Sequence, residues 1–151
     1  MQVTFHWLRV QIFCYATENP ELISETMEAL LGTSDFDREI SVSEHGNEIM
    51  IFSCRMTKQK EFKALFSRLG DEVIDDIKGD IENRVDEDCT FYIRLDKQEA
   101  VQGRYRIAHH GDVIAITGKV QSHPARKEVA VRNMLEFLDS IPHSESVSSS
   151  D

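Results

Sequence analysis

The chain has 151 residues, of which 40% are hydrophobic and 29% are charged. This length suits one core, and no apolar stretch approaches the roughly 18 residues that a membrane-spanning helix needs. The first residues lack the basic-then-apolar pattern of a signal peptide, so we expect a cytoplasmic protein with no membrane partner. The net charge of −10 excludes a uniformly basic surface. Nucleic acid repels an acidic protein, so binding it requires cations that are segregated from the acids.

The positive charge of this acidic chain is concentrated in one segment. Residues 94–132 contain four acids and eight bases, a net charge of +4, whereas the segments on either side are negative. The eight bases are Arg94, Lys97, Arg104, Arg106, Lys119, Arg126, Lys127 and Arg132. This asymmetry permits a localised anionic partner.

A long strand and a helix are predicted first. Residues 3–16 read as a strand whose apolar positions change parity after Trp7, a pattern typical either of a β-bulge or of a strand with both faces partly covered. Asn19 suits the N-cap of the next helix and Pro20 its first position, while Gly32 is a natural C-terminal stop.

A hairpin and two helices follow. Residues 40–43 and 49–55 read as strands that are joined by a polar turn, and the second is apolar on both faces. The pattern predicts a helix over 57–70 and a weaker, strongly acidic helix over 71–85. Gly79 weakens the second helix, because Gly costs about 1 kcal/mol relative to Ala in a helix.

The stretch 89–107 is predicted to be strand, compact connection, strand. Residues 91–95 alternate as a strand, 96–100 form a short polar insert that favours a helix, and 103–107 resume an extended run. This geometry can present four cations close together. They are Arg94, Lys97, Arg104 and Arg106.

A last strand and helix complete the domain. Residues 112–121 alternate as a strand, and Ser122 or His123 is expected to cap a helix with Pro124 at its first position. We expect a single domain over residues 1–139 and a disordered, serine-rich tail over 140–151.

The predicted order is β-α-β-β-α-α-β-β-β-α. Hairpins, with helices on either side of the strand-rich part, imply a mostly antiparallel sheet with helices packed on one face. The predicted fold class is therefore α+β, a two-layer sandwich.

The sequence contains no set of residues typical of an enzyme. The glycines are scattered as turn residues rather than gathered in a phosphate-binding loop, and no Cys–His or Ser–His–Asp pattern stands out. His109 and His110 are adjacent on a hairpin and point to opposite faces, so we expect no metal site. Asp96 and Glu99 are more plausible as partners of nearby bases than as an acid–base pair. We expect no catalytic residue and no cofactor; the three cysteines, Cys14, Cys54 and Cys89, are expected to be reduced, buried thiols.

The basic segment is compatible with nucleic-acid binding. Arg and Lys neutralise phosphates, and aromatic residues such as Tyr92 and Tyr105 can stack on unpaired bases. Arg126 and Lys127 lie near a predicted helix N-terminus, which also favours an anion. The alternative, that these cations balance neighbouring acids on a solvated sheet face, stays open at this point.

Four runs carry a resemblance to a known family. They are YATENPE after the first strand, FYIRLDKQEA, GRYRI and VQSHPARKEVAV. Together they resemble an archaeal family of RNA-binding proteins and predicted exosome subunits, over nearly the whole chain apart from the tail. That family is similar in fold to the large-subunit ribosomal protein that holds 5S RNA, an antiparallel sheet with helices on one side.

The resemblance implies a non-catalytic RNA-binding protein, associated with the exosome or with ribosomal RNA maturation. The residues expected to contact RNA are Arg94, Lys97, Gln98, Arg104, Arg106, Arg126 and Lys127. The alternative is a protein-interaction subunit in which RLDKQEA docks on an exosome or ribosome-assembly protein and touches no RNA. Whether the RNA is structured or single-stranded, and whether sheet edges pair into a homodimer, is left open.

Overall fold

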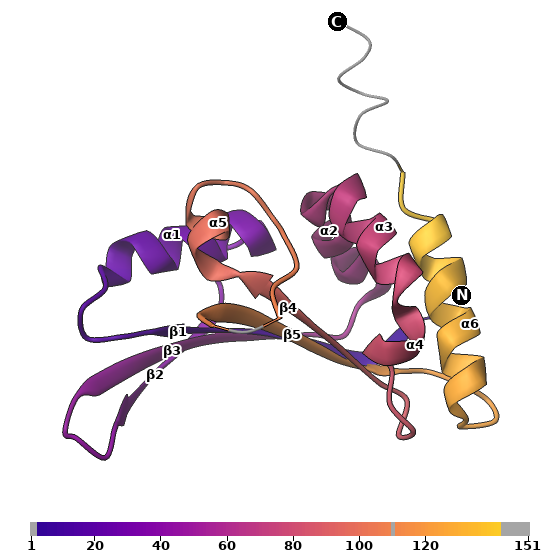
Figure 1. Ribbon diagram of the computed structural model, residues 1–151, viewed down its shortest axis with the longest axis horizontal. Helices are drawn as coiled ribbons and strands as arrows, with labels where there is room; N and C mark the ends of the chain where they lie inside the picture. The colour runs from indigo at the N-terminus through magenta and orange to yellow at the C-terminus, as the bar shows by residue number, and fades with distance from the viewer. Residues whose placement is uncertain (1–2, 110, 143–151) are drawn as a thin grey trace, which may run out of the picture.

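The computed structural model describes residues 3–109 and 111–142. It contains a five-stranded sheet of order β2-β3-β1-β5-β4, in which every neighbouring pair is antiparallel. The strands are β1 (Phe5–Cys14), β2 (Asp37–Val42), β3 (Glu48–Met56), β4 (Thr90–Asp96) and β5 (Val113–Val120). The helices are α1 (Pro20–Leu31), α2 (Gln59–Leu69), α3 (Asp71–Gly79), α4 (Ile81–Arg84), α5 (Lys97–Val101) and α6 (Lys127–Asp139). Figure 1 shows α1, α2, α3 and α5 on one side of the sheet, which confirms the predicted α+β class.

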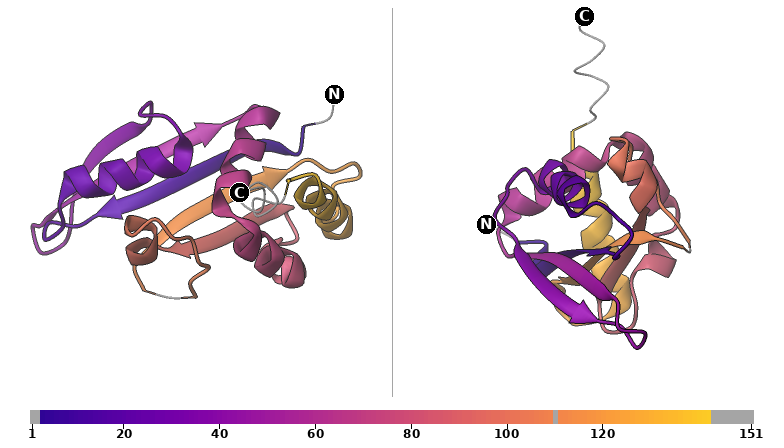
Figure 2. Two further views of the ribbon diagram at one scale, coloured as in Figure 1. Left: turned by 90° about the horizontal axis from the view of Figure 1, so that it is seen from above. Right: turned by 90° about the vertical axis from the view of Figure 1, so that its left-hand side faces the viewer.

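Only one face of the sheet is covered. Strands β4 and β5 alternate between buried residues and more exposed ones, because successive side chains of a strand point to opposite faces. Figure 2 shows α1 on one side of the sheet, with the β2–β3 hairpin curving away beneath it. The opposite face carries exposed side chains on β1 and β4. We call it the open face.

A β-bulge in β1 sets which residues reach the open face. Phe5 pairs with Val120 and Trp7 with Lys119, so two residues of β1 span one step of β5. The extra residue reverses the parity, and Phe5 and Leu8 therefore both point into the core, while Trp7 points to the open face. The bulge predicted near Trp7 is confirmed, but it lies between Phe5 and Trp7 rather than after Trp7.

Aromatic rings dominate the core between the sheet and the helices α2 and α6. The Phe5 ring lies edge-on to Phe62, with centroids 5.1 Å apart, and to Phe137 at 5.7 Å. Gly118 makes room for this cluster, because a Cβ atom there would lie 2.7 Å from Leu8 Cδ1 and 2.9 Å from Phe5 Cδ1. The bulge and this glycine thus fit β1 against β5.

The expected strand over 103–107 does not form. This segment is a loop that touches the sheet through one isolated bridge, Leu95 to Ile107. The Asp96 N–H donates to the Arg106 carbonyl and the Ala108 N–H to the Arg94 carbonyl, so the loop covers only a short part of the β4 edge. The short helix expected within 96–100 is confirmed as α5.

Two helices differ from their expected bounds. The helix expected over 71–85 is broken after Gly79 into α3 and α4. The last helix begins at Lys127 rather than at Pro124. Ser122 is buried, with its Oγ 3.3 Å from Cys89 Sγ, so its side chain faces the core instead of capping a helix.

The C-terminal boundary lies close to the edge of what the structure describes. Ile141 is buried against the core, and residues 143–151 of the expected serine-rich tail lie outside the described residues. Within the described part of the chain, no helix is long and apolar enough to cross a membrane.

Candidate nucleic-acid interface

The open face gathers cations and aromatic rings from four adjacent strands. The side chains that the strand alternation directs to it include Trp7, Arg9, Gln11, Ser53, Arg55, Tyr92, Arg94, Thr117 and Lys119. Most of these residues are far apart in the sequence, and the antiparallel register makes them neighbours. The face therefore depends on the sheet and not on any one segment.

The register forms one row across the face. Arg9 pairs with Arg55 on one side and with Thr117 on the other, and Thr117 pairs with Tyr92. Neighbouring strands lie about 4.8 Å apart, so this row of four residues extends roughly 14 Å. Arg94 lies on the next row, where it pairs with Ala115. A row of this length can contact successive charged groups of an extended polyanion.

The arginines of the open face lack acidic partners. Among the described residues, Arg9, Arg55 and Arg94 form no ion pair. Arg9 and Arg55 lie directly opposite each other, an arrangement in which like charges destabilise a sheet. An anion bound between them would remove that repulsion.

The aromatic residues flank the cations. The Tyr92 side chain is 48% exposed, and Trp7 is half-buried beside Lys119. Partial burial and the Asp86 carboxylate raise the pKa of Tyr92 above its ordinary 10.0, so the phenol stays neutral at physiological pH. A neutral ring that is open to solvent can stack on an unpaired base.

The turn between α4 and β4 positions Lys119 at one end of the open face. Asp86 Oδ1 accepts hydrogen bonds from the Asp88 N–H at 2.9 Å and the Thr90 N–H at 3.0 Å. Burial acts to raise the pKa of Asp86, but these bonds outweigh it and the pKa is lowered. The Lys119 ammonium donates to the Asp88 carbonyl, which fixes this cation at the rim.

Lys97 is the one predicted contact residue that the structure places inside the protein. Its side chain has no exposed surface, and Nζ lies 2.6 Å from the Phe13 carbonyl, 2.7 Å from Glu18 Oε1 and 3.1 Å from Asp112 Oδ2. The ammonium also lies 4.9 Å from the centre of the Tyr15 ring. A phosphate cannot reach it, so we remove Lys97 from the set that could contact RNA.

The cations around α5 are engaged with acids on the helix-covered side of the sheet. Arg104 Nε lies 3.0 Å from Glu99 Oε1, and Arg106 Nε lies 3.7 Å from the same atom. Gln98 Nε2 lies 3.4 Å from Asp112 Oδ2. Figure 1 shows α5 and the loop that follows it beside α1, away from the open face.

The cations near α6 lie at the other end of the sheet. Arg126 is the exposed N-cap residue of α6, and Lys127 Nζ lies 4.0 Å from Glu87 Oε2. The eight residues of β5 separate this group from α5, a distance of roughly 25 Å. The seven predicted residues therefore do not form one patch. Of them, Arg94 lies on the open face.

Sequence reasoning missed four residues of the open face, namely Trp7, Arg9, Arg55 and Lys119. A signal was present in β1, where Trp7, Arg9 and Gln11 alternate with the buried apolar residues. The pairing of Arg9 with Arg55 could not be seen, because it requires the register between two strands that are joined through a helix and another strand.

Residues 7–120 match a family model that is described as RNA binding. The chain belongs to this RNA-binding family. The matched segment runs from Trp7 in β1 to the end of β5, so it contains the whole open face, whereas Arg126 and Lys127 lie beyond it.

Archaeal proteins are among the relatives of this chain. A protein of Pyrococcus abyssi that bears the name RNA-binding protein is 30% identical over 144 residues, which cover 89% of this chain and 94% of that relative. A solved DUF54 protein from Methanothermobacter thermautotrophicus is 29% identical and has a TM-score of 0.73, covering 89% of this chain and 98% of its own. A DUF54 crystal structure from Archaeoglobus fulgidus is 27% identical with a TM-score of 0.74, covering 88% and 99%. The family resemblance seen in the sequence is confirmed; the likeness to a ribosomal protein stays a prediction.

The Lys97 cluster predicts a large effect on stability. Replacing Lys97 by Met should lower the free energy of unfolding by about 2–3 kcal/mol, because two carboxylates lose their shared cation. The loss falls below the roughly 3–5 kcal/mol of a fully buried pair, since Glu18 and Asp112 keep part of their surface in water. Urea denaturation measures it. The exposed Lys63→Met control should change stability by less than about 0.5 kcal/mol; equal effects of both substitutions would contradict the assignment.

The same cluster predicts a pH dependence. Burial acts to raise the pKa of Glu18, but the hydrogen bonds from Lys97 and from the Tyr15 N–H lower it below its ordinary 4.5. The stability that Glu18 contributes is therefore complete above pH 4.5 and is lost as the pH falls through the folded-state pKa. The difference in unfolding free energy between the wild type and Glu18→Gln should shrink over that acidic range. A difference that stays constant down to pH 3, in denaturant titrations at several pH values, would contradict this.

Proposed function

We propose that this protein binds RNA through the open face of its sheet. Arg9, Arg55 and Arg94 contact phosphates, and Tyr92 and Trp7 stack on bases. The observation that carries the proposal is the group of unpaired arginines beside the exposed Tyr92 ring and the half-buried Trp7 ring, on the one sheet face that the helices leave bare. Membership of the RNA-binding family supports it independently.

The charge distribution explains how so acidic a protein can bind a polyanion. The net charge of −10 opposes non-specific attraction, so binding depends on a short contact where cations outnumber acids. Arg9 and Arg55 provide that contact near the centre of the sheet. The proposal therefore predicts a small number of phosphate contacts and a modest salt dependence.

Single-stranded RNA fits the open face better than a duplex. Bases in a duplex are stacked on each other, whereas unpaired bases offer their faces to aromatic side chains. Tyr92 and Trp7 lie on β4 and β1 with β5 between them, so two bases of one strand can stack while the backbone crosses Arg9. We propose unpaired or loop RNA as the preferred ligand class.

Binding without catalysis is the role that these side chains support. The open face offers guanidinium, ammonium, amide, hydroxyl and aromatic groups, with the carboxylates of Asp37 and Glu39 at its β2 edge. These groups suit binding better than a nucleophile paired with a base would. Among the described residues, no three His, Cys, Asp or Glu side chains lie close enough to hold a metal ion. Binding and presenting RNA is therefore the activity proposed.

The association with the exosome or with ribosomal RNA maturation rests on the resemblance alone. The alternative, in which RLDKQEA docks on a protein, has less support because Leu95, Lys97 and Ala100 of this run are buried. A pull-down from nuclease-treated lysate separates the two, since a protein that is held directly by this run survives removal of RNA.

The first test measures salt dependence. Fluorescence anisotropy with a labelled single-stranded RNA should show tight binding at low salt and a linear fall of log K with log salt concentration. Replacing Arg9, Arg55 and Arg94 together by Ala should reduce the magnitude of that slope by about 2, since each phosphate contact on a single strand contributes about 0.7.

A matched triple variant controls for total charge. Arg104, Arg106 and Arg132 are exposed and lie away from the open-face row, and their replacement by Ala removes the same charge. The slope of this variant should match that of the wild type. If the slope is reduced equally in both triple variants, net charge and not the open face determines binding.

The second test addresses stacking. Tyr92→Ala should weaken binding of single-stranded RNA by about 1–3 kcal/mol, the usual contribution of one stacked base, while Tyr92→Phe should preserve it. Binding of a blunt RNA duplex should change little in either variant. Equal losses of affinity in Tyr92→Ala and Tyr92→Phe would instead identify the hydroxyl as the important group.

A further inference from the structure

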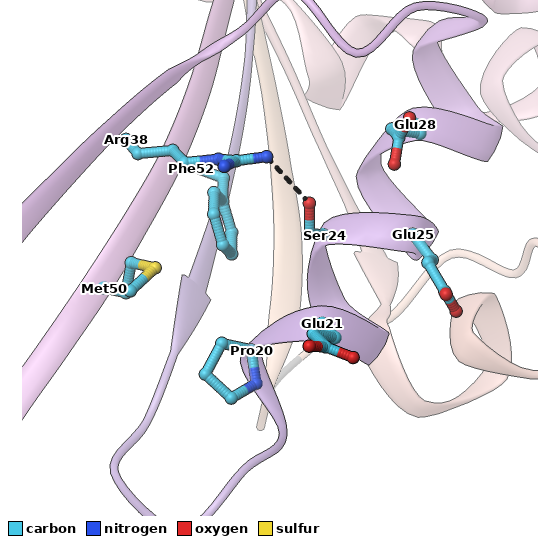
Figure 3. A pocket seen from close by; sticks show the side chains of 8 residues that line it. All are labelled: Pro20, Glu21, Ser24, Glu25, Glu28, Arg38, Met50 and Phe52. Carbon is cyan, nitrogen blue, oxygen red and sulfur yellow. Dashed lines mark hydrogen bonds between the residues drawn. The ribbon is translucent and has the colours of Figure 1, made fainter.

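A groove runs beside α1 on the helix-covered side of the sheet. Its main hollow has a volume of about 410 Å³, and its lining residues are Pro20, Glu21, Ser24, Glu25, Glu28, Arg38, Met50 and Phe52. Figure 3 shows α1 as one wall and the strands β2 and β3 as the other, with Met50 and Phe52 on the strand side. A second hollow of about 230 Å³ continues past Pro20 and Met50 to Tyr15 and Ile40. We call the two hollows together the α1 groove.

The sheet beneath this groove lacks a helix to cover it. Ile40 pairs with Met50, which pairs in turn with the buried Cys14, so Ile40 points to the same side as the core. Ile40 is nevertheless 60% exposed and Val42, two residues further along β2, is 64% exposed. These two neighbouring apolar side chains are therefore open to contact by a partner.

The α1 wall of the groove is acidic. Glu21, Glu25 and Glu28 follow one another at i, i+4 and i+7 along one side of the helix, where like charges repel. Among the described residues, no Lys or Arg forms an ion pair with them. Arg38, across the groove, donates to Ser24 Oγ at 3.1 Å and lies over the Phe52 ring at 5.6 Å, so it is already engaged.

We propose that the α1 groove docks a basic amphipathic helix of a partner protein. The docked helix lies alongside α1 on β2 and β3, its apolar residues enter the two hollows and cover Ile40, and its Lys and Arg residues face the glutamates. An amphipathic helix presents its apolar residues along one side, which suits the two hollows that follow one another beside α1. Ile40, Val42 and the half-buried Met50 provide apolar surface that the partner helix can bury, and the unpaired glutamates select a cationic partner.

This interaction is independent of the proposed RNA contact. The α1 groove lies on the side of the sheet that carries the helices, and the open face lies on the other side (Figure 1). One molecule can therefore hold RNA and a protein helix at the same time. Substitutions in one surface should leave the other unchanged.

The test uses a synthetic helix as the probe. The peptide has leucines at i, i+3, i+4 and i+7 and lysines on both flanks, and it is labelled for anisotropy with RNA-free protein. Ile40→Glu should weaken binding about tenfold or more, the effect of losing one buried apolar anchor. Glu25→Lys with Glu28→Lys should also weaken it.

Tyr92→Glu is the matched control. It adds the same negative charge as Ile40→Glu at an exposed apolar position on the open face. If the peptide is merely attracted to an acidic protein, both variants bind it as well as the wild type or better. That result would overturn the proposal, whereas weaker binding by Ile40→Glu alone supports it.

Two further measurements identify the occupant. A peptide of the same composition with a central proline should lose binding, because proline breaks the helix; undiminished binding would point to strand addition at the β2 edge and overturn the helix. Sedimentation equilibrium of the chain alone should show a monomer. A dimer that Ile40→Glu dissociates would show that a second copy occupies the groove, which also overturns the proposal.

Discussion

The buried ammonium of Lys97 holds together the end of the sheet where three segments meet. It donates to the end of β1 through the Phe13 carbonyl and to Glu18 in the loop before α1, and it pairs with Asp112 just before β5. A lysine without exposed surface is costly unless its charge and donors are matched, and here every donor has an oxygen near it. The position of α5, and with it the passage from β4 to β5, depends on this cluster.

The Lys97 cluster also explains why RLDKQEA is so recognisable. Leu95 and Ala100 are buried, and Asp96 caps α5 by accepting the Glu99 N–H at 3.0 Å. The residues of this run therefore mainly stabilise the fold. Sequence reasoning assigned its charges to RNA because lysine is almost always exposed, and the Glu18 partner lies 79 residues away in the chain. Whether a charged residue can be buried depends on partners that are distant in the chain, and the adjacent residues in the sequence do not reveal them.

Local signals predicted more of the fold than of the interface. The helix after Asn19 begins as its cap and proline indicate, and the parity change at Trp7 correctly marked a bulge. The extended run at 103–107 failed because its alternation resembles a strand, although only one bridge joins it to β4. Predicting that Arg9 and Arg55 are neighbours requires the β1–β3 register, which no local pattern contains. An interface that is spread across a sheet is in this sense a property of the topology.

The α1 groove and the centre of the open face carry opposite charges, and the acids Asp37 and Glu39 lie at the β2 edge of the open face. The glutamates of α1 lie on the helix-covered side, whereas the unpaired arginines lie on the open face. Such a separation orients an approaching polyanion, because the acidic side repels it while the open face attracts it. Under the proposed function, the acidity of the chain is compatible with RNA binding, because it opposes contact away from Arg9, Arg55 and Arg94. It also leaves the acidic side available to a cationic partner, so one sheet can separate two kinds of ligand by charge.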